Sequence, residues 1–271
     1  MRRIVLLVAV LARTTVSGAH PSLNGPLAEL TSRIQNAPDD ATLYLDRGDL
    51  QRAHGAFDSA LADYARAAAR GADPIVVHFA TGDALLTAGW PRAAEVHLDQ
   101  VLAAQPDHER ALLARARART QLGRGVEAAL DYTRVIGLQS APSPDHYVER
   151  ARALVPAGAH DEALRGLDEG IARLGQLAIL QEEAIDIDFA DRRFDRALAR
   201  IDHLLARVPA QPAWLVQRAQ ILERAARRPE AHAAFVAALS AIKTQRTGHS
   251  SAPAADTLAR DVRAALVRLH P

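Results

Sequence analysis

No stretch of this sequence alternates apolar and polar residues for long, which is the pattern expected of a half-buried β-strand. Clusters of valine, isoleucine and threonine are sparse, whereas alanine, the strongest helix former, supplies much of the apolar content. The segments Leu27–Asn36 and Thr257–Leu269 carry their apolar residues at the spacing of amphipathic helices. The pattern therefore predicts an all-α protein.

Three sets of positions recur along the chain at intervals of 34 residues, with a single interval of 35. The first set is alanine throughout: Ala60, Ala94, Ala128, Ala163, Ala197 and Ala231. The second set lies twelve residues earlier and is small in all units but one: Gly48, Gly82, Ala116, Ala151, Ile185 and Ala219. The third set lies four residues later and is large and apolar: Tyr64, Leu98, Tyr132, Leu167, Ile201 and Phe235. Six units therefore share one register.

Each unit is expected to be a hairpin of two helices. Glycines recur in the register at Gly55, Gly89, Gly123 and Gly158. A glycine there ends the first helix in a left-handed conformation, and Pro91 and Pro229 suit the first turn of the second helix. We expect the small residues where the two helices approach most closely, and the bulky residues in the gap toward the next unit. Because one hairpin cannot bury its own apolar face, neighbouring hairpins must stack.

A 34-residue period made of two helices resembles the tetratricopeptide repeat. The motif elements are Tyr44, Gly48 and the segment Gly55-Ala56-Phe57-Asp58-Ser59-Ala60 in the first unit, with Gly82, Gly89-Trp90-Pro91, Ala94 and Pro106 in the second. The sequence departs from the family at Arg47, where leucine is usual, at Ile185, where a small residue is usual, and at Arg192, where glycine is usual. The resemblance implies a right-handed α-solenoid of about six tetratricopeptide-repeat hairpins.

The register predicts the organisation of the whole chain. Residues 1–19 are expected to be a signal peptide and residues 20–40 a half-repeat helix. The six repeats span 41–242, divided as 41–74, 75–108, 109–143, 144–177, 178–211 and 212–242. A loop is predicted over 243–256, followed by a capping helix over 257–271, because an open end of a stack would expose its core.

The N-terminus has the composition of a secretory signal. Arg2 and Arg3 precede an apolar run over 4–12, and the small residues Ser17-Gly18-Ala19 offer a cleavage site. The apolar run is far shorter than the ~20 residues that span a bilayer. The sequence therefore predicts an exported protein, periplasmic or secreted. The alternative is a short buried helix in a cytoplasmic protein.

Charge and motifs argue against several functions. The net charge is +1, from 33 basic and 32 acidic side chains that interleave, so we expect no nucleic-acid partner. The chain has no cysteine, which excludes disulfides and zinc–thiolate sites. The segment His108-Glu109-Arg110-Ala111-Leu112 lacks the second histidine of a metalloprotease helix, and there is no G-x-S-x-G motif. We therefore expect no catalytic residues, no metal and no cofactor.

In the family that the sequence resembles, the first helices line an inner groove that holds peptide or protein segments. Carried over by register, the groove candidates are Asp46, Asp49, Arg52, Phe79, Asp83, Arg110, Leu113, Arg117, Glu149, Arg152, Glu182, Glu183, Asp186, Gln217, Gln220 and Glu223. Their charges run acidic, basic and acidic again. They either recognise a segment of complementary charge order or pair across neighbouring repeats and only keep the surface soluble.

The function expected from the resemblance is a non-catalytic scaffold or adaptor that binds a protein or peptide in its groove. Arg117 and Arg152, flanked by Arg110, predict an acidic segment as the partner, because forked guanidinium groups bind carboxylates bidentately. One alternative is a structural subunit of an envelope assembly that packs through its convex or edge surfaces. Another is an enzyme or metal-binding protein, suggested only by scattered histidines.

Overall fold

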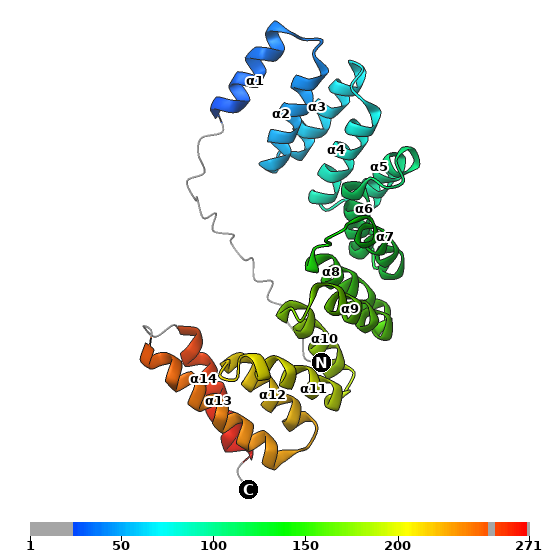
Figure 1. The fold of residues 1–271 in the computed structure, drawn as a ribbon. Helices are drawn as coiled ribbons and strands as arrows, with labels where there is room; N and C mark the ends of the chain where they lie inside the picture. Colours follow the sequence, from blue (N-terminus) through cyan, green and yellow to red (C-terminus); the bar gives the residue numbers. More distant parts are fainter. Residues whose placement is uncertain (1–23, 249–252, 270–271) are drawn as a thin grey trace, which may run out of the picture. The chain divides into compact units, whose positions relative to one another are not determined.

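The computed structural model describes residues 24–248 and 253–269 (Figure 1). Within these ranges every regular element is a helix, and no strand occurs. The all-α prediction is confirmed. The predicted signal peptide and its cleavage site after Ala19 lie outside the described residues. The described residues divide into two compact units, the first ending at Ala80 and the second beginning at Thr81.

The helices alternate as first and second members of hairpins, after a single leading helix, α1 (Asn24–Asn36). The first helices are α2 (Ala41–Ala53), α4 (Pro74–Thr87), α6 (Glu109–Gln121), α8 (Pro144–Leu154), α10 (Ala178–Ala190) and α12 (Pro212–Arg224). The second helices are α3 (Phe57–Ala69), α5 (Pro91–Ala104), α7 (Gly125–Leu138), α9 (His160–Leu174), α11 (Phe194–Arg207) and α13 (Arg228–Gly248). A 3₁₀ turn, η1 (Val155–Ala157), follows α8, and α14 (Pro253–Leu269) ends the described chain.

The turn inside each hairpin uses a left-handed residue, as the register predicts. Gly89 and Gly123 have φ angles of 82° and 73°, which glycine adopts without steric cost. In the last two hairpins Arg192 and Ala226 take the same place, with φ angles of 60° and 61°. These two residues therefore adopt a backbone conformation that costs about 1–2 kcal/mol relative to glycine.

The small residues of the register do mark the closest approach of the paired helices. A Cβ atom on Gly48 would lie 2.6 Å from Cε1 of Tyr64, and one on Gly82 would lie 2.9 Å from Cγ of Leu98. Tyr64 thus covers Gly48 within its own hairpin, where its hydroxyl donates to Asp49 at 2.8 Å. The large residues of these two hairpins thus pack on the glycine of their own hairpin, and not only in the predicted gap toward the next one.

A second repeated feature is an arginine directly before the small residue: Arg47, Arg115, Arg150 and Arg218. Arg47 donates from Nε and Nη2 to both carboxylate oxygens of Asp63, at 2.7 and 2.8 Å, and from Nη1 to Thr31 at 3.2 Å. It thereby joins α2 to the second helix of its own hairpin and to the helix before it. This link explains why arginine replaces the leucine that is usual at this position.

Arg115 repeats the arrangement two hairpins further along. It binds Asp131 of α7 bidentately at 3.0 and 2.7 Å and Asp99 of α5 at 2.8 Å. In the fifth hairpin the charges are exchanged, because Arg200 of α11 pairs with Asp188 of α10 at 3.0 Å and with Asp168 of α9 at 2.8 Å. A guanidinium group therefore links three helices in each case.

The buried carboxylates of this arrangement depend on their arginines. Burial alone favours the neutral form of Asp63, but hydrogen bonds from Arg47 and Arg66 outweigh it and lower the pKa of Asp63 below its ordinary value. The side chain of Asp63 is fully buried, so removing a partner would leave a charge in the protein interior.

The C-terminal region differs from the prediction. Helix α13 continues to Gly248 and α14 begins at Pro253, where the sequence predicts a loop over 243–256. A polar sequence after Lys243 is compatible with a helix as well as with a loop, and proline is tolerated in a first helical turn. Val262 and Leu269 of α14 are buried in a cluster with Phe235, so this helix does cover the end of the core.

Candidate partner-binding surface

Polar side chains of consecutive first helices contact one another in the second unit, always 31 or 32 residues apart. Arg117 of α6 binds Glu149 of α8 through Nε and Nη2, at 3.2 and 2.9 Å. Arg152 of α8 binds Glu183 of α10 through Nη2, at 2.8 Å. Each contact thus joins a first helix to a residue about three positions before the equivalent one in the next first helix, so consecutive first helices lie side by side.

The same series continues through the last hairpins. Trp214 of α12 donates from its indole nitrogen to Glu182 of α10 at 2.6 Å, and Gln217 donates to Asp186 at 2.9 Å. Eight residues on α6, α8, α10 and α12 thus form one continuous surface, which we name the first-helix row: Arg117, Glu149, Arg152, Glu182, Glu183, Asp186, Trp214 and Gln217.

The two arginines of the row are paired but still accessible. The side chains of Arg117 and Arg152 remain 51% and 65% exposed. The hydrogen bonds that Arg117 donates to Glu149 and Arg152 donates to Glu183 raise the pKa of the two guanidinium groups. The pairing across neighbouring repeats is therefore present, and the exposed fractions leave both side chains able to meet a partner.

The part of the row on α10 carries an excess of negative charge. Glu182, Glu183 and Asp186 lie within two turns of this helix, and Arg152 forms an ion pair with Glu183, whereas Glu182 and Asp186 accept from Trp214 and Gln217. Partial desolvation and the neighbouring charges of Glu183 and Glu182 raise the pKa of Asp186. A carboxylate in this setting is stabilised by an additional cation.

The remaining predicted candidates are distributed over both units. Asp46, Asp49 and Arg52 lie on α2 and Phe79 on α4, all in the first unit. Asp83, Arg110, Gln220 and Glu223 lie on α4, α6 and α12 in the second unit. Glu223 contacts Arg268 of α14 at 3.3 Å. Leu113 is only partly exposed, because it packs against the buried cluster that contains Ala116 and Tyr132.

Sequence reasoning missed Trp214 as a member of the row. Trp214 stands 32 residues after Glu182, which is the same interval that separates Arg117 from Glu149. This spacing could have indicated the contact. The exposed Ile179, three residues before Glu182 on the same face of α10, was missed as well. An aromatic and an aliphatic side chain therefore accompany the charged ones.

The histidines that the structure describes do not form part of a metal-binding group. His108 is the N-cap of α6, where its Nδ1 accepts the backbone N–H of Ala111 at 3.1 Å. Over the described residues, no group of three histidine, aspartate or glutamate side chains is arranged to hold a metal ion. None of the helices in those same ranges is long and apolar enough to cross a membrane.

Large apolar side chains are exposed on the second helices of two consecutive hairpins. Val96 lies on α5, and Val126 and Leu130 lie one turn apart on α7. Trp90, at the start of α5, is exposed as well. We name these four residues the α5–α7 patch.

Comparison with known proteins agrees with this architecture. Residues 79–143 match the family model described as tetratricopeptide repeat. A tetratricopeptide repeat protein from Parabacteroides merdae superposes with a TM-score of 0.54 at 20% identity, over 88% of this chain and 91% of the other. The resemblance inferred from the register is confirmed for the fold, an α-solenoid of helical hairpins. No curated protein matches the sequence.

Two further solved structures share the fold. MamA superposes with a TM-score of 0.53 at 18% identity, over 66% of this chain and 97% of MamA. PilW, described as a widely conserved type IV pilus biogenesis factor, superposes with a TM-score of 0.55 at 19% identity, over 69% of this chain and 86% of PilW. At these identities the likeness concerns the fold alone.

Proposed function

We propose that the protein is a non-catalytic scaffold that binds a segment of a partner protein along the first-helix row. The observation that carries this proposal is the continuity of the row across α6, α8, α10 and α12, with charged groups, amide groups and an indole ring in register. An extended segment can contact several successive repeats of such a surface, which gives both affinity and register.

The charges of the row specify the partner further. Arg117 and Arg152, with Arg110 nearby in sequence, suit acidic side chains, as the sequence predicts. The carboxylates of Glu182 and Asp186, whose partners in the row are neutral donors, suit basic side chains. We therefore propose a segment with acidic residues opposite α6 and α8 and basic residues opposite α10.

Export remains part of the proposal. The positively charged start, the apolar run over 4–12 and the small residues before His20 support a periplasmic or secreted location. N-terminal sequencing of the protein from its native host should then begin near His20, whereas intact Met1 would contradict export.

The binding proposal is tested by capturing partners with the full chain from the envelope and cytosolic fractions of the native host. The double variant Arg117→Ala, Arg152→Ala removes the basic half of the row, and Glu182→Gln, Asp186→Asn neutralises the acidic half. Each should weaken capture about 10- to 100-fold, because each removes two charged contacts. Circular dichroism confirms that the variants keep their helicity.

The matched control is Arg92→Ala, Arg134→Ala, which removes two exposed arginines from the second helices α5 and α7. This variant should capture the same partners in the same yield as the natural chain. If both row variants also return the same partners in equal yield, the row charges serve solubility only and the proposal is wrong.

A second candidate function is a structural subunit that packs through its second helices. The α5–α7 patch supports it, because exposed apolar side chains at neighbouring positions favour association. Replacing Val96 and Leu130 by serine would abolish that association and leave capture through the first-helix row unchanged. Loss of the captured partners in this variant would favour the structural subunit over the scaffold.

A further inference from the structure

A cavity of about 350 Å³ lies between α12 and α14, where the first-helix row ends. Val216 and Gln220 of α12, Phe235 of α13 and Val262 of α14 are among the residues that line it. Val216 directly precedes Gln217 of the row, and Gln220 follows Gln217 by one helical turn, on the same side of α12. The cavity therefore adjoins the row.

The cavity stands where the series of contacts between first helices stops. At three junctions, the residue directly after the small position of one first helix contacts the next first helix, in the pairs Arg117–Glu149, Arg152–Glu183 and Asp186–Gln217. The next residue of this series is Gln220, and the helix beyond it is α14. Over residues 24–248 and 253–269, the side chain of Gln220 forms no hydrogen bond, and it lines the cavity instead.

The cavity has an apolar floor and a polar rim. Val216, Phe235 and Val262 are 6%, 2% and 1% exposed and belong to the core cluster that α14 covers. Gln220 and Asp261 are exposed lining residues that can donate to and accept from a peptide backbone. An apolar interior with a few polar groups around it is the usual form of a ligand site.

An ion pair holds α14 to α12 beside the cavity. Arg268 of α14, which also lines the cavity, contacts Glu223 of α12 at 3.3 Å. The two helices are thus joined at one end of their junction, and the cavity occupies the part of the junction next to the row.

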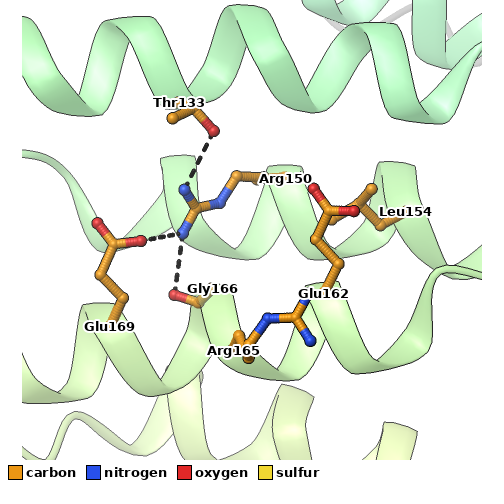
Figure 2. Close-up of a pocket in the computed structure, with 7 residues that line it drawn as sticks. All are labelled: Thr133, Arg150, Leu154, Glu162, Arg165, Gly166 and Glu169. Atoms are coloured by element: carbon orange, nitrogen blue, oxygen red, sulfur yellow. Dashed lines mark hydrogen bonds and ion pairs between the residues drawn. The ribbon is translucent and has the colours of Figure 1, made fainter.

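A second cavity, among α7, α8 and α9, does not offer such a site. Figure 2 shows Arg150 in its wall. The guanidinium group donates to Thr133 at 3.2 Å, to the backbone oxygen of Gly166 at 3.1 Å and to Glu169 at 2.7 Å. A Cβ atom on Gly166 would lie 2.7 Å from Nη2 of Arg150, so the guanidinium group itself takes the place of the aspartates at the equivalent positions of the first and third hairpins. Arg150 is satisfied within the chain, whereas the Gln220 amide is not.

We propose that the cavity between α12 and α14 accepts one large apolar side chain of the same partner segment that binds the first-helix row. The inference rests on the function proposed above, because an extended segment that follows the row past Gln217 reaches Gln220 and the cavity next. The volume lies at the low end of the roughly 300–1,000 Å³ of ligand pockets, which suits a side chain with its flanking backbone amides.

The order of the row then specifies the order of the partner segment. Acidic residues lie opposite α6 and α8, basic residues opposite α10, and the large apolar residue opposite the junction of α12 and α14. An apolar residue at this end fixes the register of the segment, since only one position of the chain offers the cavity to it.

The first test is an NMR titration of the full chain with N-acetyl-leucinamide and with N-acetyl-alaninamide, which carries the same amides and a smaller side chain. The backbone amides of Val262 and Ala265, both at the cavity, should shift saturably with the leucine probe. Binding of the alanine probe should be at least about tenfold weaker, because it buries less apolar surface. A third probe, 3-methyl-1-butanol, has the apolar group without the amides and should also bind more weakly.

The second test fills the cavity from its rim. Ala264→Phe places a ring at an exposed position of α14 that lines the cavity, so it should abolish binding of the leucine probe and weaken capture of natural partners about tenfold. The matched control is Ala237→Phe, the same exchange at an exposed position of α13 outside the cavity lining, which should change neither. Circular dichroism checks the helicity of both variants.

The inference and the proposed function fail in different ways. Equal binding of the leucine and alanine probes, or no saturable shift with either, would overturn the inference and leave the row untested by it. Equal binding of 3-methyl-1-butanol and the leucine probe would assign the cavity to a free apolar molecule and also overturn it. Undiminished capture by the two row variants, with the leucine probe still bound, would instead overturn the scaffold function.

Discussion

The repeated arginine arrangement makes a quantitative prediction for Asp131. This carboxylate accepts hydrogen bonds from Arg115 Nε and Nη2 at 3.0 and 2.7 Å and from Arg119 Nη1 at 2.9 Å. Its side chain is only 5% exposed. Replacing Asp131 by asparagine removes the charge, keeps the shape and turns an NH₂ group or a neutral oxygen toward two guanidinium groups.

The expected loss of stability depends on which ion pairs Arg115 and Arg119 keep after the substitution. Removing one partner of a buried ion pair costs about 3–5 kcal/mol, because the other charge remains in the interior. Here Arg115 keeps its ion pair with Asp99 at 2.8 Å, and Arg119 keeps its ion pair with Glu95 at 2.8 Å. The side chains of both arginines are also partly exposed. We therefore expect Asp131→Asn to lower the free energy of unfolding by about 2–4 kcal/mol.

Urea denaturation followed by circular dichroism measures this loss, and hydrogen exchange locates it. Since repeat arrays can unfold in parts, we expect the amides of α6 and α7 to exchange faster than those of α12 and α13. The matched control is Asp99→Asn, because Asp99 contacts the same arginine but is 48% exposed, and it should cost at most about 1 kcal/mol. Equal losses for the two variants would refute the argument from burial.

Three further predictions concern the hairpins and their charges. Gly48→Ala should lower the free energy of unfolding, measured in a thermal melt, by about 1–3 kcal/mol, because the new Cβ would lie 2.6 Å from the ring of Tyr64. An unchanged free energy of unfolding would mean that the ring moves freely. Arg192→Gly should raise the free energy of unfolding by about 0.5–1 kcal/mol, because glycine adopts a φ of 60° without strain. A loss of stability would show that contacts of the Arg192 side chain outweigh the strain of its backbone. The lowered pKa of Asp63 contributes stability that is fully present above its ordinary value of 3.8 and is lost as the pH falls through the lower folded value. Asp63→Asn should therefore make the free energy of unfolding less dependent on pH at the acid end. A pH profile parallel to that of the natural chain would contradict this.

The sequence predicts the hairpins well because their positions are set by local chemistry. Glycine at the end of a first helix and proline at the start of a second one are constraints within a few residues, and Gly89 and Pro91 both occupy the expected places. The end of α13 is less predictable, because a polar segment after Lys243 suits an exposed helix as well as a loop. Pattern alone does not separate those two states.

The surfaces were predictable only in part. The register placed Arg117 and Glu149 on adjacent first helices, but their ion pair depends on side-chain directions that spacing does not give. The setting of Arg150 was hidden for a different reason. A glycine at position 166 reads as an ordinary small residue until the aspartates at the equivalent positions are seen to hold arginines.

Site-specific photo-crosslinking in the native host tests the proposed scaffold most directly. A photoreactive amino acid is placed at Gln217 of the first-helix row in one variant and at Leu130 of the α5–α7 patch in another. We expect partner proteins to be captured from position 217, with the links on a segment that carries acidic and basic residues. Capture from position 130 with none from position 217 would show that the first-helix row is not the binding surface.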